Sequence, residues 1–196
     1  MAGIVLAGGE NRRMGVDKAF IKVAGRPLIE HILEALREVT APVIVVTNSP
    51  EAYASYDAIV VTDAFDKRGP LTGIYSGLLR SPDEYNVVVA CDMPFLNPRL
   101  LSHMLNIAEG NDITLPKVGE FVEPLHAVYR RELLPLIEER IKSDQRQIRG
   151  MFSGLRIRFV TEEEIDRFDP MRRSFVNLNT PEEYKEVACS DLECRN

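Results

Sequence analysis

The stretch Ile4-Val5-Leu6-Ala7-Gly8-Gly9 decides the fold, and it leads directly into a loop that carries positive charge. Four apolar residues that end in paired glycines are typical of a buried parallel strand, and open α/β sheets bind ligands beyond the carboxyl ends of such strands. Because glycine has no Cβ, Gly8 and Gly9 can adopt positive φ and let backbone N–H groups approach an anion. The following loop supplies the cations Arg13 and Lys18. We therefore predict a phosphate site at this loop.

Length and composition indicate one globular domain. The chain has 196 residues, of which 45% are hydrophobic and 28% charged, and a chain of this size buries about 70% of its unfolded surface. No apolar run approaches the roughly 18 residues of a membrane span, and the first residues lack the basic region of a signal peptide, so we expect a cytoplasmic protein. Cys91, Cys189 and Cys194 lack C-x-x-C spacing, which argues against a disulfide framework or a zinc site.

The net charge of −6 argues against binding to nucleic acid or to a membrane surface, because both call for a basic face. A bound polyanion must therefore be held locally, by a few cations and a divalent metal.

Strands and helices alternate along the first half of the chain. Apolar runs predict strands at residues 42–47 and 58–62, and apolar residues at helical spacing predict a helix at residues 27–39. This order predicts a βαβ unit with parallel pairing. The strand at residues 86–91 is the most hydrophobic, so we expect it at the centre of the sheet. The predicted fold is a single-domain α/β three-layer sandwich with a mostly parallel central sheet.

The second half continues the pattern with less regular spacing. We predict helices at 70–79, 97–107, 133–141 and 146–152, and strands at 112–116, 121–129 and 155–160. Apolar and charged residues alternate in the last strand, which predicts a strand at the edge of the sheet with Arg156 and Arg158 outward. The expected organisation is a domain over residues 1–188, with a first half over about 1–110 and a second half over about 111–188, followed by a polar tail at 189–196.

Three polar residues follow predicted strands at their carboxyl ends. They are Asn48, Asp63 and Asp92, and the last of them follows the most hydrophobic strand. Mg²⁺ is usually held by one or two carboxylates together with substrate phosphates, so Asp92 is the predicted metal ligand. The alternative for Asn48 and Asp92 is a turn-forming role close to a proline.

Four segments in the same order resemble the MobA-like nucleotidyltransferases. Residues 6–18 are similar to the family signature L-A-G-G-x-S-x-R-M-G-x-D-K, with Asn11 at a position that usually holds a small or hydroxyl residue. The other segments are G-P-L-x-G at 69–73, C-D-M-P at 91–94 and N-x-N-T-P-E-E at 177–183. The glycine loop fits neither a Walker A motif nor a dinucleotide fingerprint.

The resemblance implies a Rossmann-like nucleotidyltransferase fold and the activity of the molybdenum cofactor guanylyltransferases. That activity transfers GMP from GTP to molybdopterin or Mo-molybdopterin and releases pyrophosphate. The resemblance further implies Mg²⁺ as the cofactor. Proteins that insert molybdenum and client molybdoenzymes are possible partners. Two other readings stay open: a sibling nucleotidyltransferase that uses CTP or acts on a sugar or polyol phosphate, and a non-catalytic nucleotide-binding protein.

The resemblance also implies a nucleotide half over about 1–110, an acceptor half over about 111–188, and roles for particular residues. Catalytic roles fall to Lys18, Arg13 and Asp92, and acceptor binding falls to Asn177 and Asn179. The residues implied in nucleotide binding are Leu6, Ala7, Gly8, Gly9, Lys18, Asn48, Asp63, Gly69 and Asp92. Glu123 stands where the family often has Gln or His.

Overall fold

Strand β1 (Ala2–Leu6) lies inside the central sheet, with a parallel neighbour on each side. The structure is a computed structural model that describes residues 1–8, 18–66, 69–178 and 183. Its sheet has the strand order β10-β7-β9-β6-β1-β4-β5, and β8 pairs with β7 beside this path. The strands that flank β1 are β4 (Val43–Val46) and β6 (Tyr85–Ala90), and β5 (Ile59–Val61) pairs with β4. All of these pairings are parallel, as the predicted βαβ order requires.

The prediction that the most hydrophobic strand is central is confirmed. Strand β6 is the fourth of seven in the strand order, and Val87, Val88 and Val89 are fully buried. Successive side chains of a strand point to opposite faces, so a run of buried valines requires cover on both sides of the sheet.

The second half of the chain adds an antiparallel region to the sheet. Strand β9 (His126–Arg130) pairs antiparallel with β6 and with β7 (Ile113–Val118), and β10 (Ile157–Val160) lies parallel to β7 at the edge. The continuous strand predicted at 121–129 is wrong. It divides into β8 (Phe121–Val122) and β9, because the chain turns between them and the His126 N–H donates to the Glu123 carbonyl.

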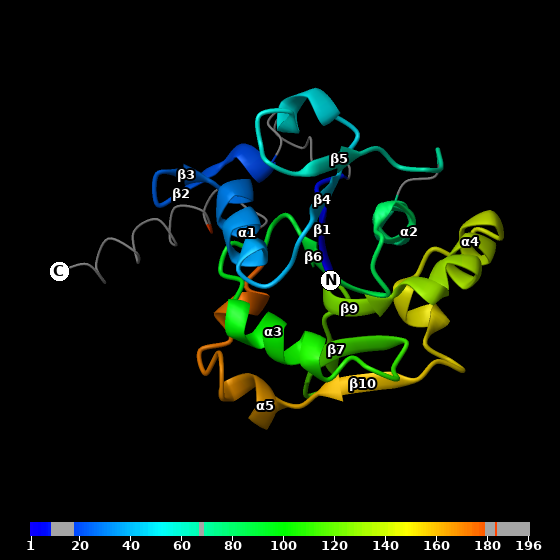
Figure 1. The fold of residues 1–196 in the computed structure, drawn as a ribbon. Coiled ribbons are helices and arrows are strands. Elements are labelled where there is room, and N and C mark those ends of the chain that lie inside the picture. The colour runs from blue at the N-terminus through cyan, green and yellow to red at the C-terminus, as the bar shows by residue number, and fades with distance from the viewer. Residues whose placement is uncertain (9–17, 67–68, 179–182, 184–196) are drawn as a thin grey trace.

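Helices cover both faces of the sheet and complete three layers (Figure 1). Helices α1 (Leu28–Arg37), α3 (Pro98–Asn106) and α5 (Glu162–Asp166) pack in the core on one face. Helices α2 (Pro70–Arg80) and α4 (Leu134–Lys142) pack in the core on the other face. The predicted α/β three-layer sandwich with a mostly parallel sheet is therefore confirmed. None of the described helices is long and apolar enough to cross a membrane.

Two predictions near the end of the chain need correction. The helix expected at 146–152 is only a 3₁₀ turn at Ile148–Met151. At the sheet edge, Arg158 is only partly exposed, because its side chain pairs with Glu164 of α5 where this helix packs over the edge and buries Val160 and Ile165 in the core.

Candidate active site

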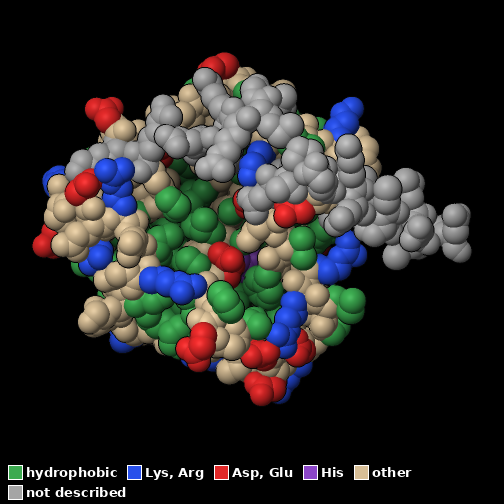
Figure 2. Space-filling view, turned by 180° about the vertical axis from the view of Figure 1, so that it is seen from behind, with side chains coloured by type: hydrophobic (Ala, Val, Ile, Leu, Met, Phe, Trp, Pro, Cys, Tyr) green, Lys and Arg blue, Asp and Glu red, His purple; other side chains and the backbone are tan. Residues whose placement is uncertain are grey.

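A cavity of about 470 Å³ opens at the carboxyl ends of the parallel strands. Figure 2 shows a hollow with a hydrophobic floor on this face of the molecule and charged side chains at its margin. The residues that line the cavity come from the ends of β1, β4, β5 and β6, from the start of α2 and from two later loops. They are Leu6, Gly8, Val46, Asn48, Asp63, Gly69, Pro70, Gly73, Ala90, Cys91, Asp92, Leu125 and Arg146.

One end of the cavity combines bare backbone with a polar pair. The Asn48 side-chain amide donates to the Asp63 carboxylate over 3.0 Å, and both side chains lie beside Gly8. A Cβ built on Gly8 would lie 3.6 Å from Asn48 Nδ2 and 3.9 Å from Asp63 Oδ2, inside the space that a ligand would use. Gly8 does not have positive φ, so our expectation about its backbone is wrong. The glycine provides room, not an unusual conformation.

Helix α2 begins at the wall of the cavity. Gly69, which precedes the helix, has φ 147° and no side chain to cap the first turn, and Pro70 occupies the first helical position. The N–H groups of a first helical turn lack partners within the helix and carry partial positive charge. This end of the cavity is therefore suited to an anion or to a polar ligand atom.

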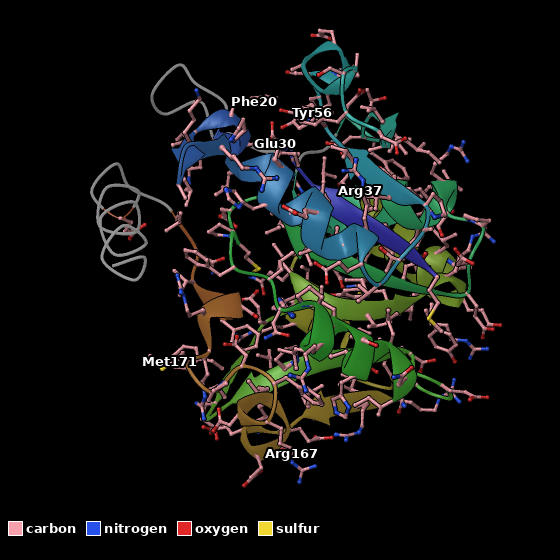
Figure 3. All side chains as sticks on the ribbon, turned by 60° about the vertical axis from the view of Figure 1, so that its left-hand side comes forward. Phe20, Glu30, Arg37, Tyr56, Arg167 and Met171 are labelled. Atoms are coloured by element: carbon pink, nitrogen blue, oxygen red, sulfur yellow. The ribbon has the colours of Figure 1, made fainter. Side chains whose placement is uncertain are left out.

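Asp92 brings a negative charge to the cavity, at the end of the strand next to β1. Burial raises the pKa of its carboxyl group, while the nearby charge of Lys18 lowers it. Lys18 opens a short 3₁₀ segment, Lys18–Phe20, whose Phe20 ring packs 5.0 Å from the Tyr53 ring and 6.4 Å from the Tyr56 ring. Figure 3 shows Phe20 and Tyr56 side by side above α1. These aromatic contacts fix the segment that carries Lys18.

A second carboxylate lies close to Asp92. Glu123 stands in the loop before β9, and burial together with the charge of Asp92 raises the pKa of its carboxyl group. The side chain of the nearby Asn177 opposes this rise in the pKa of Glu123. The adjacent Leu178 N–H donates to the Asp92 carbonyl over 2.9 Å. The two sides of the predicted site therefore meet at Asp92.

The structure brings most of the predicted nucleotide residues together, although not all. Leu6, Gly8, Asn48, Asp63, Gly69 and Asp92 line the cavity. The side chain of Ala7 is instead buried in the core, and its N–H donates to the Val46 carbonyl. Gly9, Arg13 and Asn179 lie outside the described residues.

Arg146 is a cavity residue to which the sequence assigned no role. Within the described chain it is the only basic residue among those that line the cavity, and it forms an ion pair with Asp144 over 2.7 Å. Its place depends on the packing of α4 against α2, which sequence spacing does not reveal. Leu125 reaches the cavity in the same way, from the loop before β9.

Comparison with known proteins gives the family. Residues 3–160 match the MobA-like NTP transferase domain, and this span contains every residue that lines the cavity. The chain belongs to this family. The molybdenum cofactor guanylyltransferase of Desulfosudis oleivorans is 37% identical over 95% of this chain and 94% of its own length. The molybdenum cofactor guanylyltransferase of Syntrophotalea carbinolica is 34% identical over 94% of this chain and 89% of its own length.

Solved structures agree with the MobA-like assignment. The molybdopterin-guanine dinucleotide biosynthesis protein A of Archaeoglobus fulgidus is 30% identical, with a TM-score of 0.85 over 97% of this chain and all of that one. A CMP:2-keto-3-deoxy-manno-octonic acid synthetase, solved with CTP, is 15% identical with a TM-score of 0.72 over 98% of both chains. The second likeness shows a shared fold.

Proposed function

We propose that this MobA-like protein transfers GMP from GTP to molybdopterin and releases pyrophosphate, so that the pterin becomes a guanine dinucleotide. Relatives 34–37% identical over nearly the whole chain carry the name of this activity. The observation that carries the proposal is the cavity itself. It presents bare backbone and a polar pair at Gly8, Asn48 and Asp63, and it presents a carboxylate at Asp92.

The nucleoside is expected at the Gly8 end. Guanine offers N1–H and N2–H₂ donors beside the O6 acceptor, and the ribose offers hydroxyl donors. Asp63 accepts hydrogen bonds, and its contact with Asn48 holds it at the cavity wall. The start of α2 at Gly69 adds polar backbone groups to the cavity wall.

A magnesium ion fits at Asp92 if the substrates complete its coordination. Among the described residues, no group of three or more His, Cys, Asp or Glu side chains is arranged to hold a metal by itself. Mg²⁺ commonly uses one or two carboxylates plus phosphate oxygens and water, and the half-buried Asp92 in the cavity meets that requirement. When bound, the ion neutralises part of the charge on the phosphates.

The remaining task for the protein is to hold two anions in line. Lys18, whose charge reaches Asp92, is placed to attract the phosphates of GTP, and we assign Arg13 to the same task. The acceptor is a phosphate monoester, which is already ionised near neutral pH and needs no general base. Alignment of the reacting groups and stabilisation of the charge on pyrophosphate then carry the reaction.

The acceptor is expected on the side of Asn177, close to Asp92, and we assign Asn179 to the same task. Molybdopterin with or without molybdenum fits this proposal. The proteins that insert the metal, and the molybdoenzymes that receive the finished cofactor, would act before and after this reaction.

The proposal is tested by incubating the protein with molybdopterin, Mg²⁺ and each of the four NTPs in turn. Pyrophosphate release and the mass of the pterin product should both show GTP well above ATP and CTP. Lys18→Ala should lower kcat/KM for GTP while the preference for GTP over CTP stays, since we assign Lys18 to the phosphates and not to the base. The exposed Lys22 gives the matched control, and Lys22→Ala should behave as wild type. Preferential use of CTP, or no pterin product, would contradict the proposal.

A further inference from the structure

The loop that carries Asp92 lies against a segment from the far end of the described chain. The loop spans residues 92–97, between β6 and α3, and the segment spans residues 174–178. The Leu178 N–H donates to the Asp92 carbonyl over 2.9 Å, and the Leu178 side chain is buried in the core. Figure 1 shows this segment in orange beside the start of α3. Asn177, on the expected acceptor side, directly precedes Leu178.

Ser174 joins the loop and the segment at their other end. Its hydroxyl accepts from the Asn97 N–H over 3.0 Å and donates to the Phe95 carbonyl over 3.3 Å. The side chain is fully buried, and the one hydrogen that a hydroxyl can donate is used on the loop. Because Ser174 meets the end of the loop and Leu178 meets its beginning, the two stretches run in opposite directions and are linked at both ends.

Further hydrogen bonds fix the place of the Ser174 hydroxyl. The Ser174 N–H donates to Asp169 Oδ2 over 2.8 Å, and Asp169 is itself buried. The side-chain amide of Asn97 donates to the Phe168 carbonyl over 2.8 Å. The segment that begins at Phe168 therefore holds the end of the loop through a backbone group and through a side chain.

The position of Asp92 depends on these links more than a residue within a strand would. Backbone groups of a loop lack the regular partners of a helix or a sheet, so single side chains supply them. Removal of the Ser174 hydroxyl takes a partner from the Phe95 carbonyl and from the Asn97 N–H. A group misplaced by about 1 Å can lower the rate of an enzyme by up to about 100-fold.

We propose that Ser174 is a positioning residue, whose hydroxyl holds the loop of Asp92 in register with the segment that carries Asn177. The carboxylate to which we assign Mg²⁺ then keeps a fixed place relative to the acceptor side. This inference rests on the proposed function, because Asp92 and Asn177 have their roles in that reaction. Ser174 acts through Asp92 and touches neither substrate.

Amide hydrogen exchange, followed by NMR on the protein without substrates, tests the link itself. Ser174→Ala leaves the groups of the hydrogen bond between Leu178 and Asp92 unchanged, so faster exchange of the Leu178 N–H reports movement of the segment against the loop. We expect this amide to exchange about tenfold faster or more, the effect of one lost hydrogen bond on the opening of the segment. The amides of β1 in the same variant show any change in global stability.

A buried serine at the opposite end of β6 gives the matched control. Ser81 accepts from the Asp83 N–H over 3.1 Å, just before β6 begins, whereas Asp92 follows the end of that strand. Ser81→Ala should change neither the exchange of the Leu178 N–H relative to β1 nor the rate of the reaction.

Kinetics test whether the link serves the reaction. Ser174→Ala should lower kcat for GMP transfer about tenfold, while the KM for GTP changes less than about twofold. In an Asp92→Asn background the same substitution should lower kcat less than about twofold, because a residue that acts through Asp92 then has no charge left to position. A purely structural role would give the same fold-loss in both backgrounds.

A second variant carries the test if Ser174→Ala does not fold. Asn97→Ser keeps a side chain that can cap α3 and removes the donor to the Phe168 carbonyl. It should accelerate exchange of the Leu178 N–H and lower kcat in the same way. Thermal midpoints of all variants show whether each protein is folded.

Three outcomes would overturn the assignment of Ser174. They are an unchanged kcat in Ser174→Ala, equal losses of kcat with and without the Asp92 carboxylate, and Leu178 exchange that rises no more than that of β1. Wild-type protein that makes no guanylylated pterin would instead refute the proposed function. The exchange experiment needs no substrate, so its result on the link would still stand.

Discussion

Gly8 shows how one residue serves the site through its lack of a side chain. Its backbone conformation is open to any amino acid, and a Cβ at this position would make only ordinary contacts, the nearest of them 3.6 Å from Asn48 Nδ2. The folded protein therefore tolerates a methyl group here. The cavity, by contrast, loses the volume that the methyl group occupies.

We predict that Gly8→Ala folds as stably as wild type but binds GTP more weakly and discriminates less against CTP. The methyl group narrows the cavity beside Asp63. A base that no longer fits leaves buried polar groups of the cavity without hydrogen bonds, and each such group costs about 1–3 kcal/mol of binding free energy. Calorimetric titration with GTP and CTP, together with the thermal midpoint, measures both effects. An unchanged preference for GTP would mean that this wall does not read the base.

Asp92 combines a cost for folding with a use in the reaction. Because burial raises the pKa of its carboxyl group, the charged form is disfavoured in the folded protein at neutral pH. A charge that is kept in spite of this cost suggests a functional role.

We predict that Asp92→Asn is at least as stable as wild type and loses turnover by about 100-fold or more, since the amide keeps the shape and removes the charge that binds Mg²⁺. Steady-state rates over a range of Mg²⁺ concentrations and a thermal melt provide the measurements. Activity within a few-fold of wild type at the same Mg²⁺ concentration would refute the metal assignment.

At the scale of elements, the close packing of α2 on β1 shapes the cavity. Gly73 and Gly77 lie one turn apart on α2 and face Leu6 and Ile4 of the strand. A Cβ on Gly77 would lie only 2.4 Å from Ile4 Cγ2, and Ile4 is fully buried in the middle of the sheet. The two glycines let the helix approach the strand so that its first turn reaches the ligand edge.

We predict that Gly77→Ala lowers the free energy of unfolding by roughly 1–2 kcal/mol, because overpacking outweighs the better helix propensity of alanine. Chemical denaturation measures the loss, and Gly8→Ala, where the added methyl group meets no short contact, is the matched control. Equal stability of the Gly77 variant and wild type would show that α2 moves off the strand without cost.

At the scale of the whole molecule, a buried histidine couples the sheet to the C-terminal segment. The His126 ring is fully buried, packs 5.1 Å from the Phe175 ring, and has no hydrogen-bond partner for either nitrogen among the described residues. Burial lowers the pKa of His126 to about 4, although the nearby Asp169 carboxylate opposes the shift. The folded protein therefore contains neutral His126 at pH 7.

We predict that His126 makes the protein less stable as the pH falls from about 6.5 to 4. In that range the unfolded chain binds a proton on this residue and the folded protein does not, so stability is complete above pH 6.5 and falls by about 3 kcal/mol at pH 4. Over this pH range the unfolding free energy of wild type should fall more steeply than that of His126→Leu, which lacks the titrating group. Parallel curves for His126→Leu and wild type would contradict the burial argument.

The sequence by itself determined the elements and the ligand edge of this protein. Runs such as residues 86–91 are long and apolar enough to require burial on both faces, and the stripe of α1 is set by helical spacing. Parallel pairing then places Asn48, Asp63 and Asp92 at one edge, because the carboxyl ends of parallel strands meet there.

Only the tertiary structure decided which distant residues share the site. Arg146 enters the cavity through the packing of α4 on α2. Glu123 comes close to the charge of Asp92 through a turn between two strands that the sequence pattern joined into one. His126 alternates with buried neighbours in sequence, yet its burial depends on the segment around Phe175. The physical reason is that spacing along a chain reports on local geometry alone, whereas these contacts arise when separately formed elements pack together.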